Sequence, residues 1–382
     1  MVQAKSLALK KKFALKLSAA LAAVWIMGAL VYCASCKRTV NGLGIHITLE
    51  TNTLSNGLTI IFVEDHTVPI ISYQTWFRVG SVDEQPGQTG ISHLFEHLMF
   101  KGTPKYGPKE FFQQLEARGA EVNAFTTRDY TVYYENFIPS LLEKVIDMES
   151  DRMAHLKLDE EVLNSERMVV FEERKMRTDN SPEGKMQEAL WALAYHRHPY
   201  RWPVIGYPQD LMSISVSQLI DYFKFHYQPS NATIVVVGDF NPSSTYKLIK
   251  KFNDSIPNRP RPRRQITDEP EQKEERRLII RDRAAAERFA YAYHVTSAEH
   301  NDSFALDVLA NILFEGTSSR AYRRLVEEKD IAMGLHGSAF TPAYPGLFII
   351  TGTMKKGIHV QKAEDALSEL FKEVQEQPVT DE

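Results

Sequence analysis

The sequence predicts an α+β protein built from two similar domains, each an antiparallel sheet with helices packed on one face. From Gly57 onward, β-rich runs alternate with amphipathic segments that have helical spacing. A stretch rich in proline and charge interrupts this alternation at residues 254–277, and the pattern of the first half then recurs. We therefore expect a first domain at residues 46–253, a linker at 254–277 and a second domain at 278–382.

The first domain is expected to open with two strands that pair with each other, LTIIFVED and IISYQTWFRVG. The helices expected after them span residues 89–102, 108–119, 140–155 and 159–177. The runs VNAFTT and TVYYENF predict strands between the second and third helices. The apolar run ATIVVVGDF, at residues 232–240, predicts a buried strand at the end of the domain.

The second domain repeats the first at a fixed offset. RRLIIRD and RFAYAYHV resemble the opening strands, and ILFEGTSSRAYRRLVE is similar to HLMFKGTPKYGPKEFFQQLE. Gly102 aligns with Gly316, which lies 214 residues further along the chain. Similarity over this range favours a duplicated domain over two unrelated domains. Compared with the first copy, the second is expected to be incomplete at its C-terminal end.

The composition is typical of a globular protein with a substantial core, with 43% hydrophobic and 25% charged residues. The formal net charge is only −4. The basic run RPRPRR, at residues 259–264, contains prolines and is followed by acidic residues, which is typical of a solvated linker. The charge balance therefore gives no support for nucleic-acid binding.

The first 36 residues resemble an export segment. Several lysines precede an uncharged run from Leu17 to Cys33, the pattern of a bacterial signal peptide or a membrane anchor. Ala34-Ser35-Cys36 is similar to a lipoprotein cleavage site. Redox or zinc chemistry at Cys33 and Cys36 is not favoured, because neither a βαβ context nor a second ligand pair accompanies them. We expect export to a bacterial periplasm, with membrane attachment through this segment or Cys36.

The pentapeptide HLFEH predicts a metal site. His93, Glu96 and His97 share one helix face, because positions i, i+3 and i+4 project together. Two imidazoles at this spacing can hold Zn²⁺, and the adjacent carboxylate can reach a water molecule on the metal. Chance is the alternative, since such a motif arises by accident in roughly 2 to 3% of chains of this composition. The second copy lacks the motif, so we expect one zinc ion per chain.

A later helix offers a third ligand. One stripe of this helix consists of Val162, Glu166, Val169, Glu173 and Met176. Its spacing predicts that the stripe faces the core, where an unpaired carboxylate costs several kcal/mol. A zinc ion would satisfy one of the two glutamates. A buried salt bridge, to Arg152 or Arg167, is the alternative.

At these two motifs the sequence resembles the M16, or pitrilysin, family of zinc peptidases, which includes the mitochondrial processing peptidases. GISHLFEHLMFKGT, at residues 90–103, is similar to the family signature, and ERMVVFEE, at residues 166–173, to its second motif. The resemblance covers about residues 50–382. It implies duplicated LuxS/MPP-like domains and the type of subunit that carries the HxxEH motif.

The resemblance also implies a role for each residue. His93, His97 and Glu173 would be the zinc ligands, Glu96 the general base, and Glu166 a carboxylate that orients a ligand histidine. The reaction would be endoproteolytic cleavage of peptides or unfolded segments. Zinc would lower the pKa of its water and polarise the scissile carbonyl, while Glu96 would take the proton.

A strand that contains Asn123, Ala124 and Phe125 would, by the same resemblance, bind an extended peptide through backbone hydrogen bonds. A strand next to a turn, in which the asparagine serves as a cap, is the alternative.

One part of the family pattern is absent. Active members carry an arginine and a tyrosine in the second domain that hold substrate and stabilise the oxyanion, but Val326 and Met333 occupy these positions here. An oxyanion donor contributes about 2.7 to 4 kcal/mol. Arg323 and Arg324 lie nearby and leave the arginine position open. We expect a hetero-oligomer in which an M16-like partner supplies the Arg/Tyr pair, with a homodimer as the alternative. The alternative function is a non-catalytic scaffold or assembly subunit.

Overall fold

The structure is a computed structural model that describes residues 35–42, 45–257 and 259–377. The expected leader and its uncharged run therefore lie outside the described residues, except for Ser35 and Cys36. Cys36 is exposed in the first strand. Of the helices in the described part, none has the length and apolar character needed to cross a membrane.

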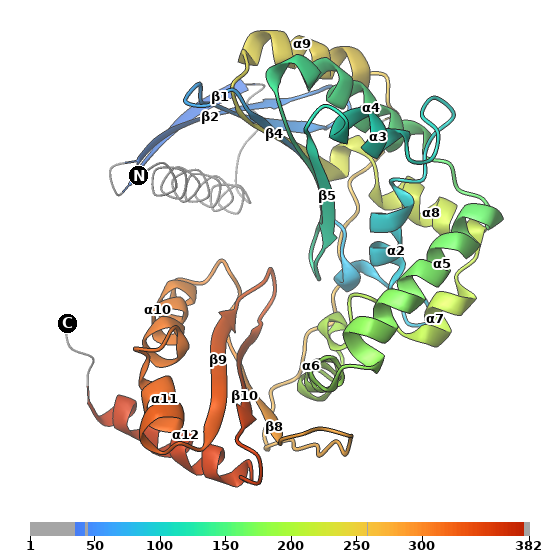
Figure 1. Ribbon diagram of the computed structural model, residues 1–382. Coiled ribbons are helices and arrows are strands. Elements are labelled where there is room, and N and C mark those ends of the chain that lie inside the picture. The colour runs from blue at the N-terminus through green and yellow to red at the C-terminus, as the bar shows by residue number, and fades with distance from the viewer. Residues whose placement is uncertain (1–34, 43–44, 258, 378–382) are drawn as a thin grey trace. The chain divides into compact units, whose positions relative to one another are not determined.

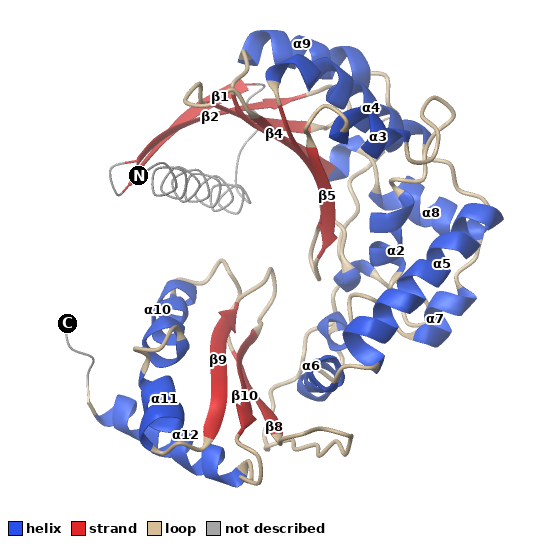
Figure 2. Ribbon diagram, viewed as in Figure 1, coloured by secondary structure: helices blue, strands red, loops and turns tan. Residues whose placement is uncertain are grey.

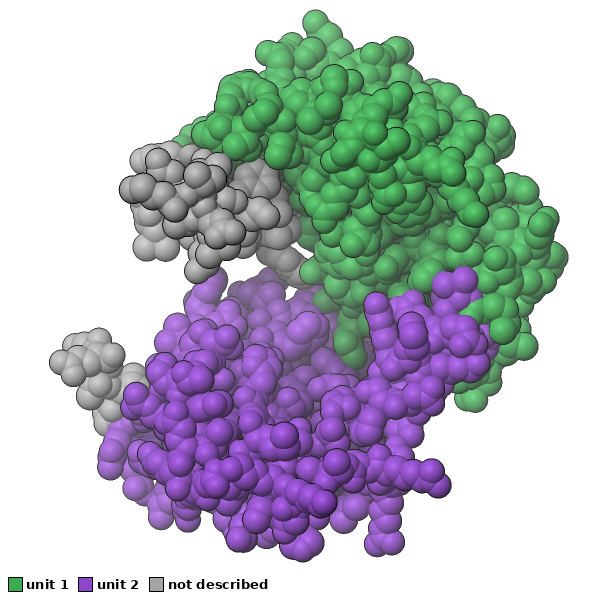
Figure 3. Space-filling model, in the orientation of Figure 1, with its two compact units in different colours: residues 1–168, 204–265 green, residues 169–203, 266–382 purple. Residues whose placement is uncertain are grey.

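The chain forms two compact units (Figure 3). The first contains residues 1–168 and 204–265, and the second contains residues 169–203 and 266–382. The domain limits expected from the sequence were defined by the internal repeat, whereas these units are defined by compactness. The expected limits therefore stay predictions.

The first unit is built on a seven-stranded sheet with the order β1-β2-β3-β7-β4-β6-β5 (Figure 1). The strands are β1 (Ser35–Gly42), β2 (Ile45–Thr53), β3 (Thr59–Glu64), β4 (Ile71–Phe77), β5 (Glu121–Thr126), β6 (Thr131–Phe137) and β7 (Ala232–Gly238). Neighbouring strands are antiparallel, except that β3 and β7 run parallel.

The α+β prediction is confirmed, but two details of the expected sheet are wrong. The sheet is mixed rather than antiparallel, and β3 does not pair with β4, because β7 lies between them. The physical reason is that β7 is apolar and almost completely buried, so it needs a strand on each side.

The helices of the first half agree with the expected elements, with shorter ends. They are α2 (Ile91–Leu98), α3 (Glu110–Glu116), α4 (Leu142–His155), α5 (Glu160–Arg174), α6 (Pro182–Ala194), α7 (Pro208–Ser213), α8 (Val216–His226) and α9 (Pro242–Asn253). In the first unit, α3, α4 and α9 lie on one side of the curved sheet (Figure 2). Helix α2 packs against β5 and β6.

The second unit contains an antiparallel sheet with the order β8-β10-β9. Its elements after the linker are β8 (Arg288–His294), α10 (Asp302–Phe314), α11 (Arg320–Tyr322), β9 (Ala332–Phe340), β10 (Leu347–Met354) and α12 (Gln361–Glu376). At the offset of 214 residues, these strands correspond to β4, β6 and β5 in the same spatial order. The structure thus agrees with a duplicated domain.

The strand expected in RRLIIRD is wrong, because residues 276–282 have no regular structure and Leu278, Ile279 and Ile280 are exposed. In the first unit the equivalent strand, β3, is held between β2 and β7. Within the described residues of the second unit, no strand lies on the outer side of β8. The segment therefore has nothing to pair with.

Candidate metal centre

Helix α2 is fixed at its N-terminal end by a glycine and a buried carboxylate. Gly90 has φ 89°, and a Cβ there would lie 2.6 Å from the carbonyl oxygen of Ile205. The Glu84 carboxyl group accepts hydrogen bonds from the backbone nitrogens of Gly90, at 2.8 Å, and Ser92, at 2.9 Å. Burial raises the pKa of Glu84 to about 8, although both hydrogen bonds favour the charged form. The start of α2 therefore has a single well-defined position.

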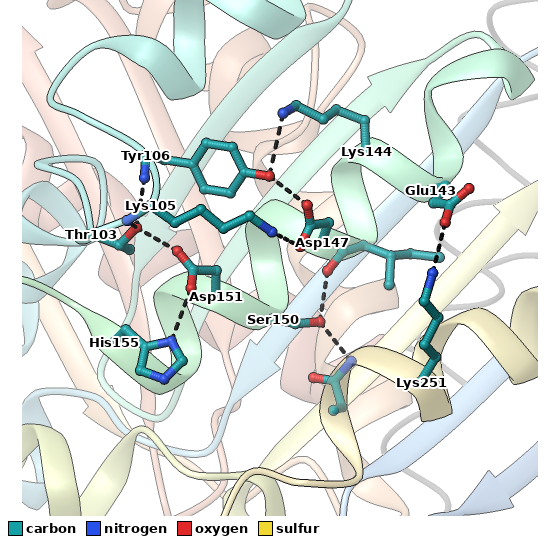
Figure 4. A network of polar contacts seen from close by, with 12 residues as sticks. Thr103, Lys105, Tyr106, Glu143, Lys144, Asp147, Ser150, Asp151, His155 and Lys251 are labelled. Carbon is teal, nitrogen blue, oxygen red and sulfur yellow. Dashed lines mark hydrogen bonds and ion pairs between the residues drawn. The ribbon is translucent and has the colours of Figure 1, made fainter.

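The segment after α2 is tied to α4 by the polar network in Figure 4. The hydroxyl group of Thr103 donates to Asp151, one turn before the end of α4. Lys105 and Tyr106 each lie 2.5 Å from a carboxylate oxygen of Asp147. Helix α2 is thus anchored at both ends, which limits the motion of the side chains it presents.

The two histidines of α2 meet a glutamate of α5. One ligand atom from each of His93, His97 and Glu173 lies within 4.8 Å of the other two. The imidazole rings are 5.0 Å apart, at an interplanar angle of 71°. Helix α5 is continuous and carries Glu173 two turns after Glu166, so helix geometry places both carboxylates along one side. The structure thus brings the three expected ligands together.

This donor set fits zinc. Two imidazole nitrogens and one carboxylate oxygen are the three protein ligands typical of a catalytic zinc, which leaves a fourth position open. The three ligand atoms lie close enough together for a single ion to contact all of them. Glu173 also contacts the exposed Arg177, at 2.5 Å, and this ion pair compensates its charge.

Glu96 lies on the same helix as the two histidines and is half-buried. Burial raises the pKa of both Tyr133 and Tyr227, and the nearby carboxylate of Glu96 contributes to the increase. The Tyr133 hydroxyl donates to the carbonyl oxygen of Phe95, at 3.2 Å, which joins β6 to α2 beside this carboxylate. Glu96 is therefore adjacent to the ligand cluster and sits on a fixed helix.

The Glu166 side chain is buried between Lys101 and His97. The Lys101 ammonium lies 2.7 Å from one of its oxygens, and Nδ1 of His97 lies 3.8 Å from the other. The alternative of a buried salt bridge is therefore found at Glu166, but its partner is Lys101 and neither Arg152 nor Arg167. Arg152 pairs with Glu135 and Glu149, whereas Arg167 donates to backbone carbonyls. Lys101 is nearer because it follows His97 by four residues, just past the end of α2.

The expected stripe on α5 is also corrected. Val169 and Met176 are exposed, whereas the buried positions of the helix are Leu163, Glu166, Val170 and Arg174. The buried line is therefore rotated relative to the predicted one. Glu166 lies on this line and Glu173 at its border, partly exposed, which suits a ligand that must reach the surface of the site.

The expected substrate-binding residues lie on the last strand of the sheet. Among the described strands, β5 pairs only with β6, so within this part of the chain its other edge presents backbone groups without a strand partner. Asn123 is exposed, and its side-chain oxygen accepts a hydrogen bond from the backbone nitrogen of Ala124, at 2.8 Å. Phe125 packs edge-on against Trp76, with ring centroids 6.4 Å apart. The edge strand lies beside the helix that carries the histidines.

Two family models match the chain. Residues 59–207 match "Insulinase (Peptidase family M16)", and residues 213–382 match "Peptidase M16 inactive domain". A crystal structure of a protease from Helicobacter pylori has a TM-score of 0.84 and 31% sequence identity, with 87% of this chain and 81% of that chain covered. The chain belongs to the M16 family.

Curated M16 relatives carry protease names. The Helicobacter pylori "Zinc protease PqqE" is 35% identical over 290 residues, which cover 74% of this chain and 65% of that relative. A probable mitochondrial-processing peptidase subunit beta from Arabidopsis thaliana is 28% identical over 267 residues, covering 69% of this chain and 50% of the plant protein. The chain thus spans just under two thirds of the bacterial relative and half of the plant one.

The second M16 domain has apolar side chains, Val326 and Met333, at the two positions where an arginine and a tyrosine were expected. Val326 packs against the core of the second unit, and Met333 is exposed on β9. The nearby Arg324 forms an ion pair with Glu373 of α12, at 2.5 Å. This arginine is therefore engaged within its own unit.

Sequence reasoning missed two residues of the site, Glu84 and Lys101. Glu84 lies in a loop before α2, and its partners are backbone nitrogens that no side-chain pattern indicates. Lys101 lies in FKGT, the last four residues of the family signature. Its place within that signature was the one sequence feature that could have indicated a role in the site.

Proposed function

We propose that this chain is a zinc-dependent endopeptidase that cleaves peptides or unfolded polypeptide segments. The observation that carries the proposal is the convergence of His93, His97 and Glu173 from two separate helices, with Glu96 directly before His97 in α2. The protease names of the M16 relatives support the same activity.

Each side chain has a step to perform. Zinc held by His93, His97 and Glu173 would activate the attacking water and polarise the scissile carbonyl. Glu96 would serve as the general base and would then donate a proton to the leaving amine. Glu166 faces Nδ1 of His97 and orients the ring. The free edge of β5 aligns an extended substrate by backbone hydrogen bonds, which explains the restriction to peptides and unfolded segments.

The proposal includes a partner subunit. With Val326 and Met333 in the second domain, the chain does not place the expected arginine and tyrosine at these positions, so we propose that an M16-like partner supplies them. A second copy of this chain would carry the same two residues, which favours a hetero-oligomer over a homodimer. We further propose an exported, periplasmic enzyme attached to the membrane through its N-terminal segment.

A non-catalytic scaffold is the second candidate function, and the apolar residues at the Arg/Tyr positions are the observation that favours it. Such a subunit would keep the fold without turnover.

The deciding experiment is cleavage of an unstructured, internally quenched peptide by the purified chain with zinc present. Turnover that disappears in Glu96→Gln would support a zinc peptidase that works alone and would contradict the partner requirement. No turnover by zinc-loaded protein, followed by activity when an M16-like subunit with the Arg/Tyr pair is added, would support the hetero-oligomer. No activity in either case would support the scaffold.

A further inference from the structure

Lys101 is a charged residue of the site to which the proposed reaction assigns no step. It is the first residue after the short turn that ends α2, four positions beyond His97. Its Nζ lies 2.7 Å from Oε1 of Glu166, a distance typical of a charge-assisted hydrogen bond. The Glu166 side chain is only 2% exposed, whereas that of Lys101 is 35% exposed and keeps contact with solvent.

The Glu166 carboxylate is almost completely buried, and a buried charge without a close partner of opposite sign costs several kcal/mol. Nδ1 of His97 lies 3.8 Å away, which is longer than a hydrogen bond. Ser165 offers only a hydroxyl group at 3.4 Å. Of these three neighbours, Lys101 is the one that lies close enough to form an ion pair with the Glu166 carboxylate.

The ion pair also fixes the orientation of the carboxylate. Because Lys101 holds Oε1, the second oxygen of Glu166 is directed to Nδ1 of His97. An imidazole whose Nδ1 faces a carboxylate presents Nε2 on the opposite side of the ring, where a metal ion can bind. Lys101 therefore acts on His97 through Glu166, without contact with substrate or metal.

We propose that Lys101 is a positioning residue that holds the Glu166 carboxylate in its orientation, and so preorganises His97 for zinc. This inference rests on the proposed zinc site and adds a residue to it. Loss of a residue that orients a ligand typically weakens metal binding about 10- to 100-fold. A loss of this size is expected for Lys101→Met, which keeps the aliphatic stem and removes the charge.

The test measures the zinc dissociation constant of the full chain by competition with a chromophoric chelator. Lys101→Met is expected to bind zinc about 10- to 100-fold more weakly than wild type, and Lys101→Arg to recover most of the affinity. Lys37→Met is the matched control, because this lysine also pairs with a glutamate, Glu50 at 3.0 Å, but lies on β1 outside the contacts that anchor α2. It should bind zinc as wild type does.

A double-mutant comparison separates positioning from a general structural role. If Lys101 acts through Glu166, Lys101→Met has no further effect on zinc affinity in a Glu166→Gln background. The double variant carries no unpaired buried charge, so it remains informative if Lys101→Met alone is poorly folded. Thermal unfolding of each metal-free variant reports its folding independently.

The outcomes are distinguishable. Wild-type affinity in Lys101→Met, or an undiminished effect in the Glu166→Gln background, would overturn the role of Lys101 and leave the zinc site standing. A wild-type chain that holds no stoichiometric zinc would instead overturn the proposed function, together with the inference that rests on it.

Discussion

Two adjacent glutamates of α5 provide a matched pair of variants. Glu173 belongs to the ligand cluster, whereas Glu172 is exposed and pairs with Lys175 at 2.6 Å. Glu173→Gln is expected to abolish stoichiometric zinc binding and peptide cleavage, because an amide is a much weaker zinc ligand than a carboxylate. Glu172→Gln should leave both unchanged. Zinc content after dialysis and the cleavage rate are the measurements, and equal behaviour of the two variants would contradict the assignment.

His226, at the end of α8, makes a pH-dependent contribution to stability. Burial lowers the pKa of His226 to about 4, while the unfolded chain keeps the ordinary value of 6.5. Between pH 6.5 and pH 4, the unfolded state therefore binds more protons at this histidine than the folded state does. The contribution of His226 to the unfolding free energy is fully present above pH 6.5 and is lost as pH falls towards 4. Between pH 7 and pH 5, this group alone lowers the unfolding free energy by about 2 kcal/mol.

Urea unfolding at pH 7 and pH 5 tests this effect. His226→Gln should show a smaller loss between the two pH values than wild type. His196→Gln is the control, because His196 is exposed, and it should keep the wild-type slope. A wild-type slope in His226→Gln would exclude this histidine as the source.

The residues of the candidate site were predictable only where the signal is local. His93, Glu96 and His97 follow from helix spacing, and Glu173 was identified through a motif. The partners of Glu166 were not predictable, since three basic residues lie near it in sequence or space and only packing selects Lys101. The raised pKa of Glu84 likewise results first from its burial, which the sequence does not show, although the adjacent Asp83 adds to the increase.

At the scale of elements, the Glu84 cap determines how α2 begins. The pKa of Glu84 is raised by burial to about 8, above its ordinary value of 4.5. The folded state therefore binds the extra proton between these values, and this contribution to stability is lost as pH rises from 4.5 to 8. Glu84→Gln is expected to remove that decline, because the amide is neutral throughout and can still accept from one backbone nitrogen.

Glu84→Ala differs from this variant, since it leaves the backbone nitrogens of Gly90 and Ser92 without the carboxyl acceptor. It is expected to cost about 1 to 3 kcal/mol of unfolding free energy at every pH. Unfolding free energies of both variants from pH 5 to pH 8.5 are the measurement. An undiminished decline in Glu84→Gln would contradict the raised pKa.

Helices and strands were largely predictable, but their pairing was not. The helix that carries HLFEH and the strand β7 form where their patterns indicate. The position of β7 between β3 and β4 results from pairing between segments that are far apart in the sequence. Hydrophobic patterns within one segment do not indicate which distant segment it pairs with. RRLIIRD has a strand-like composition, but strand formation also requires a neighbour.

At the scale of the whole molecule, the internal repeat relates α10 to α2. At the offset of 214 residues, Leu94 and Phe95 correspond to Val308 and Leu309. Leu94 and Phe95 are completely buried, and Phe95 stacks on Tyr222 of α8. On α10, by contrast, Val308 is 59% exposed and Phe304, one turn earlier, is 74% exposed. An exposed apolar face of this kind favours association.

In the absence of the proposed partner, we expect the purified chain to self-associate through this face of α10. The double variant Phe304→Ser and Val308→Ser should shift the protein towards the monomer in sedimentation velocity at micromolar concentration. Met212→Ser is the control, because Met212 is an exposed apolar residue of the first unit. An unchanged oligomer distribution in the double variant would contradict this prediction.

The parallel pair β3 and β7 also constrains the order in which the first unit folds. Thr59 of β3 lies opposite Thr233 of β7, so the centre of the sheet joins segments that are synthesised far apart in time. Contacts over such sequence distances form slowly, because a long loop must close first. Until β7 leaves the ribosome, β3 and β4 lack the strand that joins them. The nascent chain therefore exposes apolar strand edges during this interval, when protection by a chaperone would matter most.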